Sequence, residues 1–194
     1  MSKSKILIIV ESPAKCEKIE GFLGHNYKCI ASYGHIRELK KDNTAYDENN
    51  NYKPNFQLIE ARKEYLDNIK PIIKNHEEIL IATDDDREGE AIAWHICKVF
   101  KLSIKNTKRL IFNSITRDAI LSALRKPQKI NMSIVYAQRT RQILDQMLGF
   151  SVTPILWKHV SHTAKLSAGR CQTPALRLIY DRYLSIKNAE DTIT

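Results

Sequence analysis

Two short apolar runs constrain the fold of this chain more than any other feature of its sequence. Residues 5–10 (KILIIV) and 78–83 (EILIAT) consist mainly of aliphatic side chains. Runs of this length and composition indicate strands that are buried on both faces of a parallel sheet. A helical pattern follows each run, and the alternation of strands with helices predicts an α/β fold with a mainly parallel sheet.

The first helix has recognisable signals at both of its ends. Ser12 and Pro13 form a typical helix start, and Gly24 is a typical stop. Pro71 is expected to interrupt a later helix, and the polar, Asn-rich residues 40–55 are expected to form a long surface loop. We expect strands at residues 27–32, 56–60 and 109–112, and helices at 13–23, 64–74, 88–100, 117–124, 132–148, 153–160 and 173–186.

The pattern changes after Pro127, where helices replace the alternation of strands and helices. No convincing strand is expected after Phe112. We therefore predict a domain boundary near Pro127, with an α/β domain at residues 1–127 and the helical start of a second domain at residues 128–194.

Charge and cysteine usage narrow the class of protein. The net charge of +9 alone makes nucleic acid a modest favourite as a partner, beside the alternative of a basic surface that serves only solubility. No apolar run approaches the roughly 20 residues of a membrane span, and the N-terminus lacks the apolar core of a signal peptide. The four cysteines form no CxxC pair, which argues against a zinc site or a disulfide framework. We expect an intracellular protein with reduced thiols.

A dense group of carboxylates follows the second apolar run. Residues 84–86 are all aspartate, and Glu88 and Glu90 come directly after them. Parallel strands end at one edge of a sheet, so Glu11, which follows the first run, is expected to meet this group. Anions this close repel one another, and a magnesium ion with oxygen ligands would offset that repulsion.

Not every carboxylate in this group need bind a metal. Asp84 and Asp86 alternate onto one side of an extended backbone and are the expected ligands, together with Glu11. Glu88 is either a third ligand from this run or a favourable charge at the helix N-terminus. Asp85 is expected to be solvated, and Glu90 to interact with the helix dipole.

Several motifs together resemble the N-terminal region of type IA DNA topoisomerases, the topoisomerase I and III group, with their Toprim domain. The matching segments are residues 9–15 (IVESPAK), 34–39 (GHIREL), 83–95 (TDDDREGEAIAWH), 112–116 (FNSIT), 137–145 (AQRTRQILD), 154–157 (PILW) and 166–172 (LSAGRCQ). They cover nearly the whole chain in the expected order. The resemblance implies a Rossmann-like Toprim domain at residues 1–127 and the first part of the helical DNA-binding domain at residues 128–194.

The resemblance also implies roles at the catalytic end of the first domain. Glu11 would lie beside the scissile phosphate as a metal ligand or general acid/base, and Lys15 would place a positive charge on that phosphate. Asp84, Asp86 and Glu88 would hold Mg²⁺ for rejoining of the strand. Two residues of the second motif, His35 and Arg37, would lie near the path of the DNA.

A second set of residues would form the groove for single-stranded DNA. Arg141 and Asp145 share a helix face, so they form either an ordinary ion pair or part of this groove, with Asp145 contacting a base. Trp157 either stacks on a base or is buried, and Arg170 offers two parallel donors to a phosphate. The remaining residues implied in DNA binding are Gln142, Phe150, Ser167, Ala168, Gly169, Cys171 and Gln172.

The family reaction is ATP-independent breakage and rejoining of one DNA strand through a tyrosine that becomes joined to a 5′-phosphate. None of the eight tyrosines has the expected nucleophile context. We therefore expect an N-terminal fragment that is monomeric, binds Mg²⁺ and single-stranded DNA weakly, and relaxes no negatively supercoiled DNA alone. The alternatives are a Toprim nuclease or primase, which shares the acidic residues, and a non-catalytic DNA-binding module.

Overall fold

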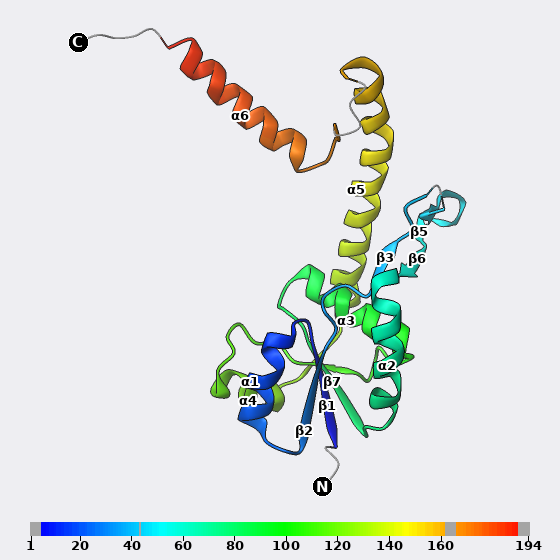
Figure 1. The fold of residues 1–194 in the computed structure, drawn as a ribbon, viewed down its shortest axis with the longest axis vertical. Helices are drawn as coiled ribbons and strands as arrows, with labels where there is room; N and C mark the ends of the chain where they lie inside the picture. The colour runs from blue at the N-terminus through cyan, green and yellow to red at the C-terminus, as the bar shows by residue number, and fades with distance from the viewer. Residues whose placement is uncertain (1–4, 43, 162–165, 190–194) are drawn as a thin grey trace, which may run out of the picture. The chain divides into compact units, whose positions relative to one another are not determined.

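A five-stranded sheet lies at the centre of the first of two compact units, Met1–Thr140 and Arg141–Thr194, in the computed structural model (Figure 1). The structure describes residues 5–42, 44–161 and 166–189. The strand order is β2 (Tyr27–Ala31), β1 (Ile6–Val10), β7 (Glu78–Ala82), β8 (Lys108–Arg109) and β9 (Gln128–Lys129). All neighbours run parallel except β9, which is antiparallel to β8. The predicted α/β fold with a mainly parallel sheet is therefore confirmed.

The register of the central strands decides where the functional residues lie. Val10, the last residue of β1, pairs with Ala31 of β2 and Ala82 of β7. The three strands therefore end at the same edge of the sheet. The residues that follow β1 and β7 begin side by side at this edge.

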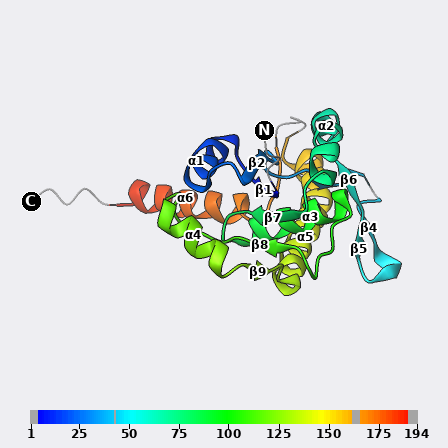
Figure 2. The same cartoon turned by 90° about the horizontal axis from the view of Figure 1, so that it is seen from below.

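Two hydrophobic cores cover the two faces of the sheet. Leu7 and Ile9 point into one core, with α2 (Lys63–Lys74) and α3 (Arg87–Phe100). Ile8 and Val10 point into the other, with α1 (Pro13–Leu23) and α4 (Arg117–Arg125). Figures 1 and 2 show these two helix pairs on opposite sides of the sheet. Burial on both faces explains why β1 has no polar residue.

Two small antiparallel pairs extend from the first unit. Strand β3 (Arg37–Leu39) pairs with β6 (Phe56–Leu58), and β4 (Tyr46–Asp47) pairs with β5 (Lys53–Pro54). The expectation of a plain loop at residues 40–55 is wrong, because Asn51 and Tyr52 adopt positive φ angles of 53° and 52° and turn the chain back into a hairpin. Short 3₁₀ turns, η1 (Glu48–Asn50) and η2 (Glu60–Arg62), complete this region.

Three further expectations about elements are wrong. Pro71 lies inside α2 without interrupting it, because the packing of Leu66, Ile69 and Ile73 outweighs one lost hydrogen bond. The two helices expected between residues 132 and 160 form one helix, α5 (Met132–His159). Strand β9 was not expected, because two exposed polar residues carry no hydrophobic period.

The second unit contains the later part of α5 and α6 (Gln172–Lys187). No residue of α6 is buried, and most of its apolar side chains, including Leu178 and Ile179, are exposed. Among the helices that the structure describes, none is long and apolar enough to cross a membrane.

Candidate active site

Hydrogen bonds join two carboxylate residues and one lysine, Glu11, Asp84 and Lys15, near the carboxyl ends of β1 and β7. Glu11 follows β1, and its Oε1 accepts a hydrogen bond of 2.8 Å from the backbone N–H of Asp84. Lys15, in the first turns of α1, donates its Nζ–H to the carboxylate of Asp84. The structure therefore brings together predicted residues from two separate parts of the sequence, residues 9–15 and 83–95.

The next carboxylates of the acidic run lie at the start of α3. Asp86 is the N-cap, and its Oδ1 accepts a hydrogen bond of 2.7 Å from the backbone N–H of Gly89. Glu88, in the first turn, has its Oε2 3.9 Å from Nε2 of His35. Asp86 thus has a structural contact that the spacing of the carboxylates did not predict.

Gly89 allows α3 to begin close to the Asp84 loop. A Cβ atom built at this position would lie 2.1 Å from the carbonyl oxygen of Asp84. No side chain can occupy that space, because the neighbouring atom belongs to the backbone. The glycine is therefore part of what positions Asp84.

A buried ion pair stabilises the loop that contains Asp84. Nη1 of Arg109 lies 2.7 Å from Oε2 of Glu90, and both side chains are at most 5% exposed. Arg109 also donates to Oγ1 of Thr83, at 3.0 Å, and to the backbone carbonyl of Asp84. Glu90 accepts a further hydrogen bond of 2.6 Å from the N–H of Asn131. Arg109 thus links β8 to the Asp84 loop.

The expectation that Glu90 only interacts with the helix dipole is wrong, because that side chain is buried against Arg109. Sequence reasoning also missed Arg109 as a positioning residue. A signal was present, since Arg109 opens the short apolar run at residues 109–112 that was expected to be a strand. A charged residue in a buried strand needs a partner of opposite charge.

The electrostatics of Glu11 reflect its crowded surroundings. Burial raises the pKa of the Glu11 carboxyl, and the negative charges of Asp84 and Asp86 raise it further. The hydrogen bond from Asp84 and the positive charge of Lys15 act in the opposite direction. Glu11 is therefore more easily protonated than an exposed glutamate.

The available donors fit a divalent cation in their chemistry, since Glu11, Asp84, Asp86 and Glu88 offer carboxylate oxygens. The crowding of Glu11 by two negative charges is the kind of repulsion that a cation relieves. Within the described residues, however, no three acidic, histidine or cysteine side chains converge closely enough to hold a metal. Asp84 contacts Lys15 instead, and one oxygen of Asp86 contacts Gly89.

Arg37 is the first residue of β3, His35 comes just before that strand, and both side chains lie near α3. The Nη2 of Arg37 donates to the carbonyl oxygen of Phe56 at 3.4 Å, and its guanidinium carbon lies 5.2 Å from the Phe56 ring centroid. His35 lies against His95, with ring centroids 6.5 Å apart. His35 therefore connects the acidic run to an aromatic cluster.

In the second unit, Asp145 lies between two arginines. Its Oδ1 accepts a hydrogen bond of 2.7 Å from Nε of Arg170, and its Oδ2 lies 3.6 Å from Nε of Arg141. The hydrogen bond from Arg170 lowers the pKa of Asp145. The two donors that Arg170 was predicted to offer a phosphate thus face Asp145 in this structure.

The other residues predicted to bind DNA differ in their exposure and in their contacts. Trp157 is 40% exposed, so the alternative of a buried tryptophan is wrong, and its Nε1 donates to the carbonyl oxygen of Leu166 at 2.7 Å. Phe150 and Cys171 are exposed, and Gln142 is half-buried. Hydrogen bonds join Ser167 to Gln172 (3.1 Å) and the N–H of Ala168 to Thr153 (3.1 Å). Gly169 lies next to Gln172, since an added Cβ would lie 3.3 Å from its side-chain oxygen.

Comparison with known proteins relates both units to one group. Residues 6–115 match the Toprim domain family, and residues 129–192 match the DNA topoisomerase family. Among solved structures, full-length topoisomerase I from Thermotoga maritima is 40% identical, with a TM-score of 0.84. The similarity covers 95% of this chain and 31% of that protein, so the chain spans about a third of the length of the relative it matches.

Proposed function

Because the chain belongs to the type IA DNA topoisomerases and carries their Toprim domain, we propose that it contributes the acidic half of a site that breaks and rejoins one DNA strand. The contact of Glu11 and Lys15 with Asp84 at the end of β1 and β7 is the observation that carries this proposal. This contact supports a role for Glu11 in proton transfer and for Lys15 as the positive charge beside the phosphate.

In the proposed reaction, a tyrosine outside this chain gives its phenolic proton to water and attacks the scissile phosphate. A bond from the tyrosine to the 5′-phosphate forms as the bond from phosphorus to the 3′-oxygen breaks. Lys15 binds a non-bridging phosphate oxygen and offsets the negative charge of the transition state. Glu11 in its protonated form gives a proton to the leaving 3′-oxygen, and its raised pKa supports this role. In rejoining, the same carboxylate takes that proton back.

Magnesium is proposed as the cofactor for rejoining. Glu11, Asp84, Asp86 and Glu88 would hold Mg²⁺, which would supply positive charge beside the phosphate when bound. The second unit would bind the single-stranded segment through Asp145, Arg141 and Arg170, with neighbouring residues of the groove. His35 and Arg37 would lie along the path of the strand.

The whole enzyme is proposed to act as a monomer inside the cell, without ATP, and to relax negatively supercoiled DNA. Residues 1–127 would form its catalytic domain, and residues 128–194 the beginning of its DNA-binding domain. The two family matches leave residues 116–128 between them, which supports a boundary near Pro127. The chain's contacts divide it later, after Thr140, inside α5.

The test uses the full-length enzyme that contains this chain. Alanine at both Asp84 and Asp86 is expected to slow Mg²⁺-dependent rejoining of a cleaved oligonucleotide by at least about tenfold. Asp85→Asn, a neighbouring exposed aspartate, serves as the control and is expected to rejoin at the wild-type rate. Unchanged rejoining in the double variant at limiting Mg²⁺ would refute the metal-binding role.

The form of the cleaved product separates this proposal from a nuclease. A covalent adduct between the protein and the 5′-phosphate supports a topoisomerase. Free ends without any adduct would support a Toprim nuclease, and binding without cleavage would support a DNA-binding module.

A further inference from the structure

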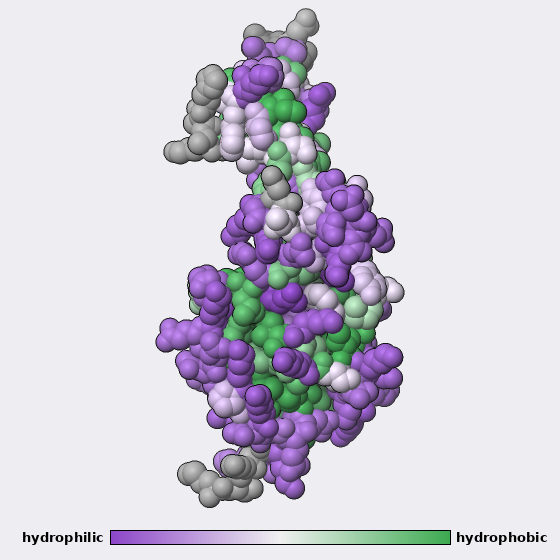
Figure 3. All heavy atoms as spheres, turned by 90° about the vertical axis from the view of Figure 1, so that its right-hand side faces the viewer, coloured by the Kyte–Doolittle hydropathy of each residue, from purple (hydrophilic) through white to green (hydrophobic). Residues whose placement is uncertain are grey.

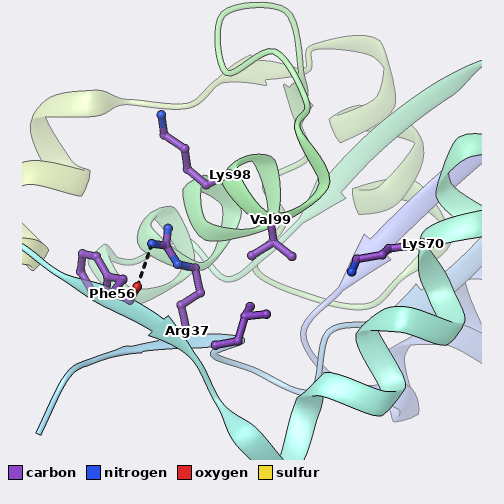
Figure 4. Close-up of a pocket in the computed structure, with 6 residues that line it drawn as sticks. Arg37, Phe56, Lys70, Lys98 and Val99 are labelled. Atoms are coloured by element: carbon purple, nitrogen blue, oxygen red, sulfur yellow. Dashed lines mark hydrogen bonds between the residues drawn. The ribbon is translucent and has the colours of Figure 1, made fainter.

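A cavity of about 410 Å³ opens in the first unit, away from the acidic residues. Two strands, β3 and β6, form one side, and helices α2 and α3 form the others (Figure 4). Figure 3 shows the side of the first unit that carries α2, with apolar surface exposed among hydrophilic side chains. The described residues that line the cavity are Arg37, Phe56, Leu58, Lys70, Lys98 and Val99.

The lining combines three cationic side chains with three apolar ones. Arg37, Lys70 and Lys98 carry positive charge, and the described lining residues include no carboxylate. Lys70 is paired outside the lining with Asp67, at 2.5 Å. Lys98 lies 5.9 Å from the centroid of the Trp94 ring. Among the described residues, it forms no ion pair with a carboxylate.

Arg37 is the cation that most requires an anion. It is half-buried, and in the described part of the chain it forms no ion pair. Its contacts are a long hydrogen bond to the carbonyl of Phe56 and the faces of two aromatic rings. Burial lowers the pKa of Arg37, and the nearby charge of Arg139 lowers it further. A partly desolvated guanidinium without a carboxylate is costly unless an anion binds to it.

The size and the mixed lining of the cavity favour a nucleotide over a small inorganic ion. A volume of about 410 Å³ lies within the range of small-molecule sites, roughly 300–1,000 Å³. The three cations suit a phosphate, since arginine and lysine are the usual phosphate partners. Phe56, Leu58 and Val99 provide apolar surface for a sugar or a base.

The cavity is separate from the acidic site. Lys98 lies ten residues after Glu88 on the same helix, which corresponds to about 15 Å along α3. None of the acidic residues of the proposed active site contributes to the lining.

We infer that this cavity binds a nucleotide phosphate, presented either by a single-stranded DNA segment or by a free nucleotide, outside the catalytic site. This inference rests on the proposed function, in which Arg37 lies along the path of the strand, and it adds a phosphate site that does not depend on the cleavage reaction. A strand held here would lie on the far half of α3 from the acidic run. A second segment of the same DNA could thus be retained while the first is cut.

The test titrates the 194-residue chain with the dinucleotide pTpT while methyl NMR signals of Leu58 and Val99 are followed. These signals are expected to shift with saturation. Lys70→Gln combined with Lys98→Gln is expected to weaken binding about tenfold. Lys28→Gln combined with Lys126→Gln removes the same charge from exposed positions outside the cavity. This control is expected to change the affinity by less than about twofold.

Two further arms complete the test. Asp67→Asn releases Lys70 from its ion pair and is expected to strengthen binding about two- to threefold. Tighter binding of pTpT than of thymidine monophosphate identifies a DNA strand as the source, and equal binding identifies a free nucleotide. Equal losses in the pocket and control variants would overturn the inference. Equal shifts with a hexaglutamate peptide would also overturn it, because the cavity would then accept any anion.

Discussion

Gly89 shows how one residue without a side chain determines the geometry of a charged loop. The helix that follows the acidic run begins so close to Asp84 that a Cβ at this position would lie 2.1 Å from a backbone oxygen. The hydroxyl of Thr83 donates to the carbonyl of Gly89 at 2.8 Å, which ties the two segments together. The position of Asp84 therefore depends on the absence of a side chain nearby.

Gly89→Ala is expected to lower the free energy of unfolding by about 2–3 kcal/mol, because the backbone must move to admit the methyl group. Urea unfolding of the chain measures this change. Gly21→Ala in α1 is the matched control, since nothing lies within 4 Å of its added Cβ. That substitution is expected to stabilise the helix by up to about 1 kcal/mol. Equal effects of the two substitutions would contradict the close approach.

Arg109 lies in a buried ion pair, where loss of one partner leaves the other charge unpaired. Arg109→Ala is expected to cost about 3–5 kcal/mol of unfolding free energy. The adjacent Lys108 forms an exposed pair with Glu78 at 2.7 Å, so Lys108→Ala is expected to cost at most about 1 kcal/mol. Chemical denaturation of both variants measures the loss of unfolding free energy in each. A loss below about 1 kcal/mol for Arg109→Ala would argue against the structural role of Arg109.

His95 is fully buried, and neither ring nitrogen has a hydrogen-bond partner in the described part of the chain. Burial lowers its pKa to about 3, and the charges of Arg37, His35 and Arg139 act in the same direction. The pKa of His95 in the folded chain lies below the unfolded value of about 6.5. The neutral His95 ring therefore makes its full contribution to the free energy of unfolding above pH 6.5. This contribution is lost as the pH falls from 6.5 towards 3.

Unfolding free energy measured between pH 7 and pH 4 tests this effect. The stability of the wild-type chain is expected to fall across this range. His95→Leu should show a smaller fall, because it removes a group that the unfolded chain protonates. His25→Gln, at an exposed position, should retain the wild-type dependence. The same pH dependence in His95→Leu and wild type would show that other groups cause it.

At the scale of elements, the sequence predicted those with strong local signals. The strands β1 and β7 have continuous apolar runs, and α1 begins at Pro13 and ends before Gly24. Strand β6 lies within the strand expected at residues 56–60, but its partner β3 and the pair β4–β5 were not predicted, because strands of two or three residues have no measurable period. The break expected between residues 148 and 153 does not occur, because a glycine such as Gly149 costs only about 1 kcal/mol in a helix.

The candidate site was predictable where it follows from the ends of strands, and not where it depends on tertiary contacts. The meeting of Glu11 with Asp84 follows from the ends of two parallel strands. The capping of α3 by Asp86 and the burial of Glu90 against Arg109 depend on tertiary contacts. Spacing along the chain does not contain that information, since Arg109 lies 19 residues after Glu90.

The helix α6 is expected to be the least protected helix in the chain. None of its residues is buried, whereas four of the five residues of β1 are. Isolated helices of this length are marginally stable in water. Hydrogen exchange of the 194-residue chain should therefore label α6 amides orders of magnitude faster than β1 amides. Equal protection of the two elements would show that other parts of the chain cover α6.

At the scale of the whole molecule, a net charge of +9 coexists with a local concentration of carboxylates. The positive charge suits a protein that holds DNA, and the acidic run suits one that acts on its phosphates. The chain matches 31% of the length of the Thermotoga maritima topoisomerase I structure. The proposed reaction therefore requires groups from outside this chain, above all the nucleophilic tyrosine.

The most direct test of the central claim is the formation of the covalent DNA adduct by the full-length enzyme that contains this chain. With a single-stranded oligonucleotide, Glu11→Gln is expected to lower the rate of adduct formation at least about 100-fold. Glu17→Gln, at an exposed position on α1, is the matched control and should leave the rate unchanged. Adduct formation by Glu11→Gln at the wild-type rate would contradict the proposed role of this site.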